Sequence, residues 1–175
     1  GESSMLFDLS PLALWGQVRD WRRFLLLDPL HQTLDDVKPA RDSRTPAGTT
    51  FLIRHRFCGI GPTRSGRILR WREGSEIAIS DLSRRGPALG FPHICTYQVR
   101  PEGNRARLIL GVRGLWTARW VPRPLINLWL RWVLLATEAH IRHEILAFER
   151  WRGSIARNRA RIMKNTRASL PARVQ

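Results

Sequence analysis

Four ionisable residues stand on strand-like segments in phase with the apolar residues of those segments: His55, Asp81, His93 and Tyr97. A buried polar group without a partner costs roughly 1 to 3 kcal/mol, and in a cavity a ligand can be that partner. His93 and Asp81, with Tyr97, could also serve as acid and base in a cyclase or dehydratase reaction. The alternative is that His93 and Asp81 end their strands in water, and that Tyr97 bonds a core carbonyl.

A second group with chemical potential lies near the C-terminus, where His140, His143 and Glu144 follow Glu138. His140 and Glu144 are four residues apart and could share a helix face, but the pattern is not HExxH and the spacing reveals no third ligand. We therefore expect solvated or ion-paired histidines and no metal. The sequence contains no P-loop, GxGxxG or GxSxG motif, so we also expect no cofactor.

The two cysteines, Cys58 and Cys95, occupy apolar strand contexts that would raise a thiol pKa rather than activate it. Two cysteines are too few for a disulfide framework, although one bridge between them stays open. The N-terminus lacks a basic region followed by an apolar core, so no secretory signal is visible. These features together predict a cytoplasmic protein.

The chain has 175 residues, of which 43% are hydrophobic, as expected for one folded domain. Its net charge is +16, and eight basic residues but no acidic one follow Glu149. The basic tail could bind an anionic membrane surface or nucleic acid, or it could be a disordered, solubilising extension. Ser154 could cap a separate basic helix within this tail.

The elements that must position the candidate residues are marked by two different spacings of apolar residues, one helical and one of period two. Ser10-Pro11 is a good helix start, and helical spacing follows it to about Leu25. From Thr50 to Thr117 the period is two, with turns at Glu73-Gly74 and at "PEGN". Alternation of this kind predicts an antiparallel sheet with one covered and one wet face.

A long helix over residues 124–151 is the best candidate to cover that sheet. Its apolar run of 12 residues contains Arg131 and is too short to span a membrane, which takes about 20 residues. We expect Leu128, Trp132, Leu135 and Ala139 to face the sheet or a cavity. Trp71 and Trp116 are further candidates to line a cavity, Trp120 to guard its mouth, and residues 83–92 to form a loop or lid.

The order helix, antiparallel strands, long C-terminal helix resembles the SRPBCC superfamily, the START-like and polyketide cyclase/dehydrase group. The segments that carry the resemblance are "FDLSPLALWGQVRDWRRF", "GRILRWREGSEIAISD", "GFPHICTYQVRP" and "GLWTARWVPRPL". The resemblance implies an α+β helix-grip fold, in which a curved antiparallel sheet wraps around a long C-terminal helix and encloses an apolar cavity. We assign residues 1–152 to this domain and residues 153–175 to a basic extension, helical or disordered.

The leading functional prediction is a carrier or sensor of a small hydrophobic or lipid-like ligand. The residues predicted to line its cavity are His55, Trp71, Tyr97, Trp116, Leu128, Trp132, Leu135 and Ala139. Two alternatives stay open: a cyclase or dehydratase that uses His93, Asp81 and Tyr97, and a basic protein that contacts membranes or nucleic acid.

Overall fold

The computed structural model describes residues 1–40, 44–56, 63–81, 91–116 and 121–168. Its elements, in chain order, are β1 Glu2–Phe7, α1 Pro11–Val18, α2 Trp21–Leu25, β2 His31–Lys38, β3 Thr50–His55, β4 Thr63–Arg72, β5 Glu76–Asp81, β6 His93–Glu102, β7 Arg105–Gly114 and α3 Arg123–Ala168. The chain divides into two compact units, Gly1–Ile141 and Arg142–Gln175, and α3 runs through the division. Residues 57–62, 82–90 and 117–120 lie outside the described residues, so the predictions for Cys58, Trp120 and most of the loop 83–92 do too.

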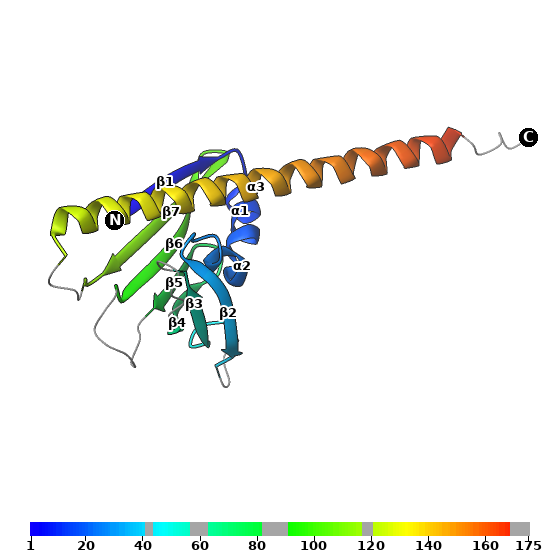
Figure 1. Ribbon diagram of the computed structural model, residues 1–175. Helices are drawn as coiled ribbons and strands as arrows, with labels where there is room; N and C mark the ends of the chain where they lie inside the picture. The colour runs from blue at the N-terminus through cyan, green and yellow to red at the C-terminus, as the bar shows by residue number, and fades with distance from the viewer. Residues whose placement is uncertain (41–43, 57–62, 82–90, 117–120, 169–175) are drawn as a thin grey trace, which may run out of the picture. The chain divides into compact units, whose positions relative to one another are not determined.

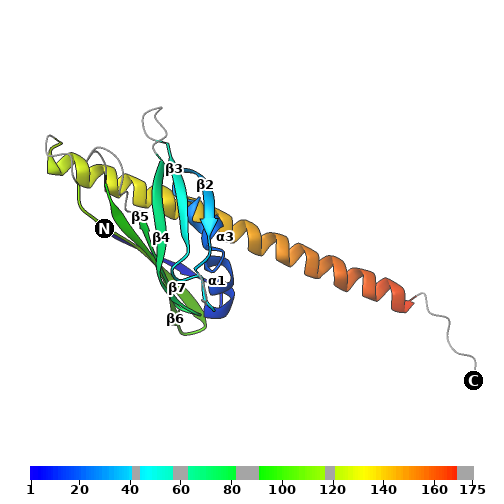
Figure 2. The same cartoon turned by 90° about the horizontal axis from the view of Figure 1, so that it is seen from below.

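Seven strands form one antiparallel sheet in the order β1-β7-β6-β5-β4-β3-β2 (Figures 1 and 2). The hairpins predicted at Glu73-Gly74 and at "PEGN" join β4 to β5 and β6 to β7. The predicted helix start is also confirmed, because the Ser10 hydroxyl accepts the backbone N–H of Ala13 at 3.2 Å and proline occupies the first helical position. α1 packs against β6 and β7 and covers one end of the sheet.

The central strand β5 departs from the predicted one-sided alternation, because all six of its residues are buried. Its position in the middle of the sheet explains part of this burial. On the other face, Arg70 and Arg72 of β4 reach the Glu76 carboxylate at 3.2 and 3.4 Å. Their aliphatic stems can cover apolar surface while their guanidinium groups stay in water.

The part of α3 up to Ile141 lies alongside the sheet (Figure 1). It buries a different face from the one predicted. The buried residues of α3 up to Ile141 are Ile126, Val133, Leu134, Thr137 and Ile141. Leu128, Trp132 and Leu135 are 66%, 54% and 56% exposed, and Ala139 is exposed too. The expectation that these four pack on the sheet is therefore wrong, while a part for them in ligand binding stays a prediction. The helix is apolar nearly all round here, so periodicity alone could not select its buried face.

The described residues of the second unit, 142–168, belong to the C-terminal part of α3. Ser154 does not cap a new helix, because its hydroxyl donates to the Trp151 carbonyl one turn earlier at 2.7 Å. Residues 153–168 of the predicted extension are thus helical, and the domain boundary at residue 152 stays a prediction. No helix among the described residues has the length and apolar character that a membrane span requires.

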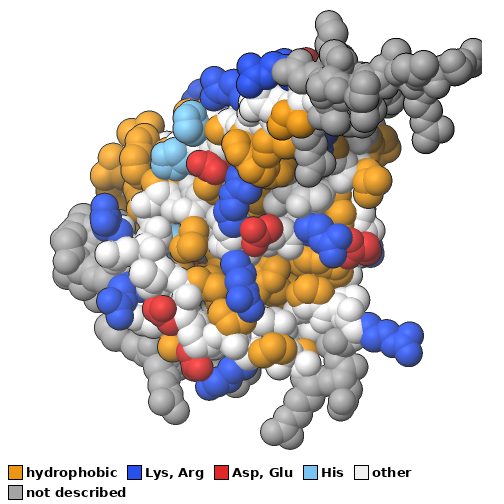
Figure 3. Space-filling model, turned by 90° about the vertical axis from the view of Figure 1, so that its right-hand side faces the viewer, with side chains coloured by type: hydrophobic (Ala, Val, Ile, Leu, Met, Phe, Trp, Pro, Cys, Tyr) orange, Lys and Arg blue, Asp and Glu red, His pale blue; other side chains and the backbone are white. Residues whose placement is uncertain are grey.

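Basic side chains are spread over the face drawn in Figure 3, among hydrophobic and acidic ones. The positive charge is therefore not confined to the C-terminal extension. An interaction of the tail with membranes or nucleic acid stays a prediction.

Glu73, in the turn between β4 and β5, joins that hairpin to α1. Its carboxylate accepts the indole N–H groups of Trp15 and Trp71, each at 2.8 Å. The Trp15 bond, then the Trp71 bond, and Arg19 at 3.8 Å hold the pKa of Glu73 below its ordinary value. The carboxylate is largely exposed, so we expect Glu73→Ala to lower the free energy of unfolding at neutral pH by no more than about 1 kcal/mol.

The contribution of Glu73 to the free energy of unfolding should decrease as the pH falls. Because the folded-state pKa of Glu73 is lowered, its stabilisation is present above the ordinary carboxyl pKa and is lost as the pH falls through the folded-state value. Urea unfolding at a series of pH values should show the gap between wild type and Glu73→Ala closing in acid. Glu2→Ala, at an exposed position on β1, is the control. A gap that is the same in acid as at neutral pH would contradict this explanation.

Candidate functional site

A cluster of buried polar side chains is assembled from two cross-strand pairs. His31 of β2 stands opposite His55 of β3, and Asp81 of β5 stands opposite His93 of β6. Side chains directly opposite each other on antiparallel strands lie close enough to interact. Arg64 of β4 is the fifth member, and we call these five residues the histidine–aspartate cluster.

Asp81 is at the centre of the cluster, with its side chain only 4% exposed. Its Oδ2 atom lies 3.0 Å from His55 Nε2, 3.4 Å from an Arg64 guanidinium nitrogen and 3.6 Å from His93 Nδ1. The His55 ring is not aligned for a hydrogen bond in spite of the short distance. Among the described residues, Asp81 Oδ1 and both ring nitrogens of His55 have no hydrogen-bond partner. The cluster therefore holds buried polar atoms that a bound molecule could satisfy.

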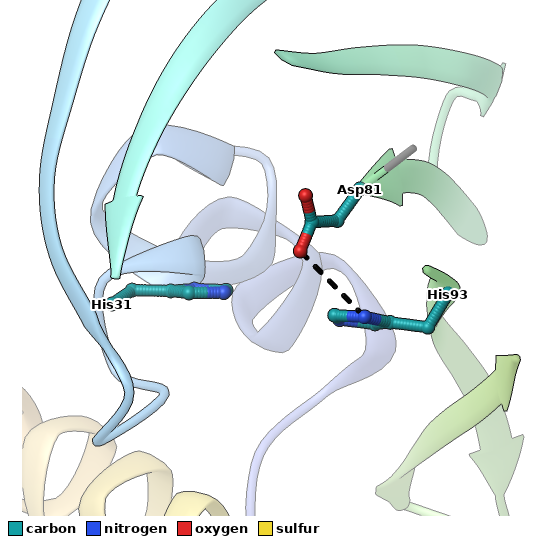
Figure 4. Close-up of side chains that lie close together, drawn as sticks. All are labelled: His31, Asp81 and His93. Carbon is teal, nitrogen blue, oxygen red and sulfur yellow. Dashed lines mark ion pairs between the residues drawn. The ribbon is translucent and has the colours of Figure 1, made fainter. Parts of the chain in front are cut away.

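The backbone fixes the orientation of the two outer histidines. His31 Nδ1 lies 2.6 Å from the Leu25 carbonyl oxygen, and His93 Nδ1 lies 2.7 Å from the Phe91 carbonyl oxygen. A carbonyl oxygen can only accept, so Nδ1 carries the proton in each ring, and Nε2 holds the lone pair when the ring is neutral. Arg64 also donates to the Phe91 carbonyl, at 3.0 Å. Figure 4 shows the His31 ring pointing toward Asp81 and His93.

Burial and neighbouring charges set the protonation of the cluster. Burial is the largest cause that lowers the pKa of His31, and the nearby His55 lowers it further, against the opposing effect of Asp28. Burial by itself raises the pKa of Asp81. The nearby His55, His93 and Arg64 outweigh that effect, so the Asp81 pKa lies below its ordinary value. The cluster thus favours a carboxylate beside a neutral His31.

Aromatic rings adjoin the cluster. The Phe91 ring stacks on His93 with 5.2 Å between centroids. Trp116, after β7, and Trp129, on α3, lie 6.3 and 6.1 Å from Phe91 and 5.7 Å from each other. Phe91 is buried, whereas Trp116 and Trp129 are half-buried. We call Phe91, Trp116 and Trp129 the aromatic group, which places partly accessible apolar surface beside the polar cluster.

The other predicted site residues lie elsewhere. Tyr97 is buried four residues along β6 from His93, which is roughly 13 Å of strand. Its ring packs edge-on against Phe24 at 5.7 Å, and burial raises its pKa well above the ordinary value. Trp71 packs against Trp15 at the α1 end of the sheet, with centroids 5.5 Å apart. The structure thus brings Asp81, His55 and His93 together but does not join Tyr97 or Trp71 to them.

Cys95 is a free thiol between these regions, and it is buried on β6. Burial raises its pKa well above the ordinary value, as the sequence predicted, and so keeps it protonated at neutral pH. It is therefore poorly suited to act as a nucleophile.

Two members of the cluster were missed from the sequence, His31 and Arg64. His31 begins an edge strand whose segment "HQTLDDVK" shows no clear alternation and pairs with β3 through register shifts. Arg64 had a recognisable signal, because it is in phase with Gly66 and Ile68, the buried positions of β4. An arginine on that face indicates a buried carboxylate partner.

No family model and no curated protein sequence matches this chain. Solved structures do match it. A START superfamily protein from Mycobacterium smegmatis is 13% identical with a TM-score of 0.60, covering 83% of this chain and 95% of its own. The Zhui aromatase/cyclase from Streptomyces sp. R1128 is 14% identical with a TM-score of 0.59, covering 83% and 92%.

The protein Ara h 8.0201 is 12% identical with a TM-score of 0.60, covering 84% of this chain and 97% of its own. At such low identities the likeness shows the fold alone. The chain has the α+β helix-grip fold, a seven-stranded antiparallel sheet with a long C-terminal helix, and the resemblance to the SRPBCC superfamily is confirmed at that level.

Proposed function

We propose that this protein binds a small hydrophobic ligand that carries one polar group, and that it acts as a carrier or sensor. The observation that carries the proposal is that an apolar surface and a polar cluster are in contact. The aromatic group adjoins the histidine–aspartate cluster through the stacked rings of Phe91 and His93. Pockets for small molecules combine such apolar walls with a few convergent polar groups.

The polar end of the ligand would be held by the unpartnered atoms of the cluster. Each buried polar atom without a partner costs roughly 1 to 3 kcal/mol, and a ligand hydroxyl, carbonyl or carboxyl group can offset that cost. Asp81 Oδ1 can accept a hydrogen bond, while His55 can donate or accept one. A ligand that lacks a polar group would leave these atoms unsatisfied, so we expect the protein to discriminate against plain hydrocarbons.

The apolar end would lie against Trp116 and Trp129. Both rings are half-buried and pack edge to face, and aromatic rings of this kind supply large apolar contact surfaces. The helix-grip fold is shared with a START superfamily protein and an aromatase/cyclase, which supports a ligand-binding class but selects no particular ligand. The cytoplasmic setting inferred from the two cysteines remains part of this proposal.

Native mass spectrometry can test the proposal. The purified protein would be incubated with a mixture of long-chain fatty acids and planar aromatic phenols, and the bound species identified. We expect wild type to retain one molecule per chain. We expect Trp129→Ala to bind it at least about tenfold more weakly, because a central aromatic contact often contributes more than 1.4 kcal/mol.

Trp151→Ala is the matched control, since Trp151 is an exposed tryptophan of the second unit. It should bind as wild type does. Binding that Trp129→Ala leaves unchanged, or a wild type that retains nothing from the mixture or from the cells that made it, would refute the proposal.

A further inference from the structure

Three side chains of the cluster have the composition and spacing of a metal site. One ligand atom from each of His31, Asp81 and His93 lies within 4.8 Å of the other two. Four ligands at 2.0 to 2.1 Å around a tetrahedral ion are roughly 3.3 Å apart, so a pair at the 4.8 Å limit needs to close by about 1.5 Å. We propose that His31, Asp81 and His93 bind one divalent first-row transition metal ion of the zinc class.

The surroundings of these side chains match those of ligating residues in metalloproteins. A metal-bound histidine almost always donates its other N–H to a carbonyl or carboxylate, which fixes the ring and its tautomer. His31 and His93 both do so, to the carbonyl oxygens of Leu25 and Phe91. His55 and Arg64 approach one oxygen of Asp81 and would orient the ligating carboxylate.

The ligand set also selects among ions. Calcium and magnesium need several oxygen ligands, whereas Asp81 is the one carboxylate in this group. Two imidazoles and one carboxylate suit zinc, iron or a similar ion and leave coordination positions for water or for the polar end of a ligand. The proposal does not depend on the proposed function, because the metal alone can be tested.

The site differs from the one that the sequence drew attention to. On α3, His140 Nδ1 is bonded to the Leu27 carbonyl at 3.1 Å, and the exposed His143 lies 4.0 Å from Glu144. Within the part of the chain that the structure describes, the group of three candidate ligands is His31, Asp81 and His93. The histidines of α3 therefore provide internal controls.

The test uses the full chain after dialysis against a chelator, titrated calorimetrically with Zn²⁺ alone. We expect one ion per chain, and binding at least about a hundredfold weaker in His31→Gln and in His93→Gln, since each loses a direct ligand. His140→Gln should bind zinc as wild type does. Equal affinity in all four proteins would overturn the proposal.

Because a variant could fail to fold, the wild type provides a second measurement. Nitrogen-15 spectra of its histidine rings should show that one equivalent of Zn²⁺ shifts the His31 and His93 signals and leaves His143 unchanged. Shifts confined to His140 and His143, or no stoichiometric change, would overturn the proposal. Trp129→Ala separates the two ideas: it should bind zinc normally even where it loses the hydrophobic ligand.

Discussion

Replacing Asp81 by alanine should lower the free energy of unfolding by about 3 kcal/mol, because breaking a buried ion pair leaves its partners uncompensated. Asp81 lies within 3.6 Å of His55, Arg64 and His93, and its carboxylate is the negative group that these three face in common. Arg64 is nearly buried and would lose its charge partner. Urea unfolding in the presence of a chelator, followed by tryptophan fluorescence, measures the change without any contribution from metal.

Glu102→Gln is the control for Asp81→Ala. Glu102 also bonds an arginine, Arg107, but both side chains are partly exposed at the end of the β6–β7 hairpin. Exposed ion pairs contribute little to stability, so this variant should unfold close to wild type. An Asp81→Ala protein that is as stable as Glu102→Gln would mean that the cluster is not an electrostatic unit.

Replacing Leu134 by alanine should cost about 3 kcal/mol, whereas the same change at its neighbour Leu135 should cost less than about 0.5 kcal/mol. Leu134 is 8% exposed and Leu135 is 56% exposed, although the two are adjacent on α3 and chemically identical. The lost methyl groups of Leu134 leave a cavity, while those of Leu135 leave only solvent-exposed surface. Chemical unfolding of the two variants is therefore a matched comparison.

The comparison of Leu134→Ala with Leu135→Ala tests which face of α3 is buried. The sequence alone predicted that Leu135 faces the sheet or a cavity, whereas in the structure Leu135 is exposed and Leu134 is buried. Leu135→Ala as the more destabilised variant would restore the face predicted from the sequence and contradict the structure.

The fold could be predicted from the sequence because its strongest signals are local. Ser10-Pro11, the turn at Glu73-Gly74 and the alternation around Cys95 each act over a few residues, and each prediction is confirmed. The orientation of α3 could not be predicted in the same way. Both of its faces are apolar over residues 125–136, so the choice between them depends on the shape of the sheet rather than on the helix.

Only part of the candidate site could be predicted from the sequence, again because only local patterns can be recognised there. His55 and His93 share the phase of the apolar residues of their strands, and Asp81 follows Ile77 and Ile79 at the same spacing of two. Their inward direction follows from that period in the sequence. His31 joins them only through the pairing of β2 with β3, and no local pattern encodes that pairing. Tyr97 has the same phase as His93 but lies farther along the strand, so a shared face did not mean a shared site.

The central claim is that the histidine–aspartate cluster and the aromatic group together hold one small molecule. A crystal structure of the protein soaked with the molecule identified by native mass spectrometry tests this most directly. We predict its apolar part against Trp129 and its polar group within hydrogen-bond distance of Asp81, His55 or His93, or of a metal ion held there. Density for the molecule at another place, with the two groups packed directly against protein side chains, would contradict the claim.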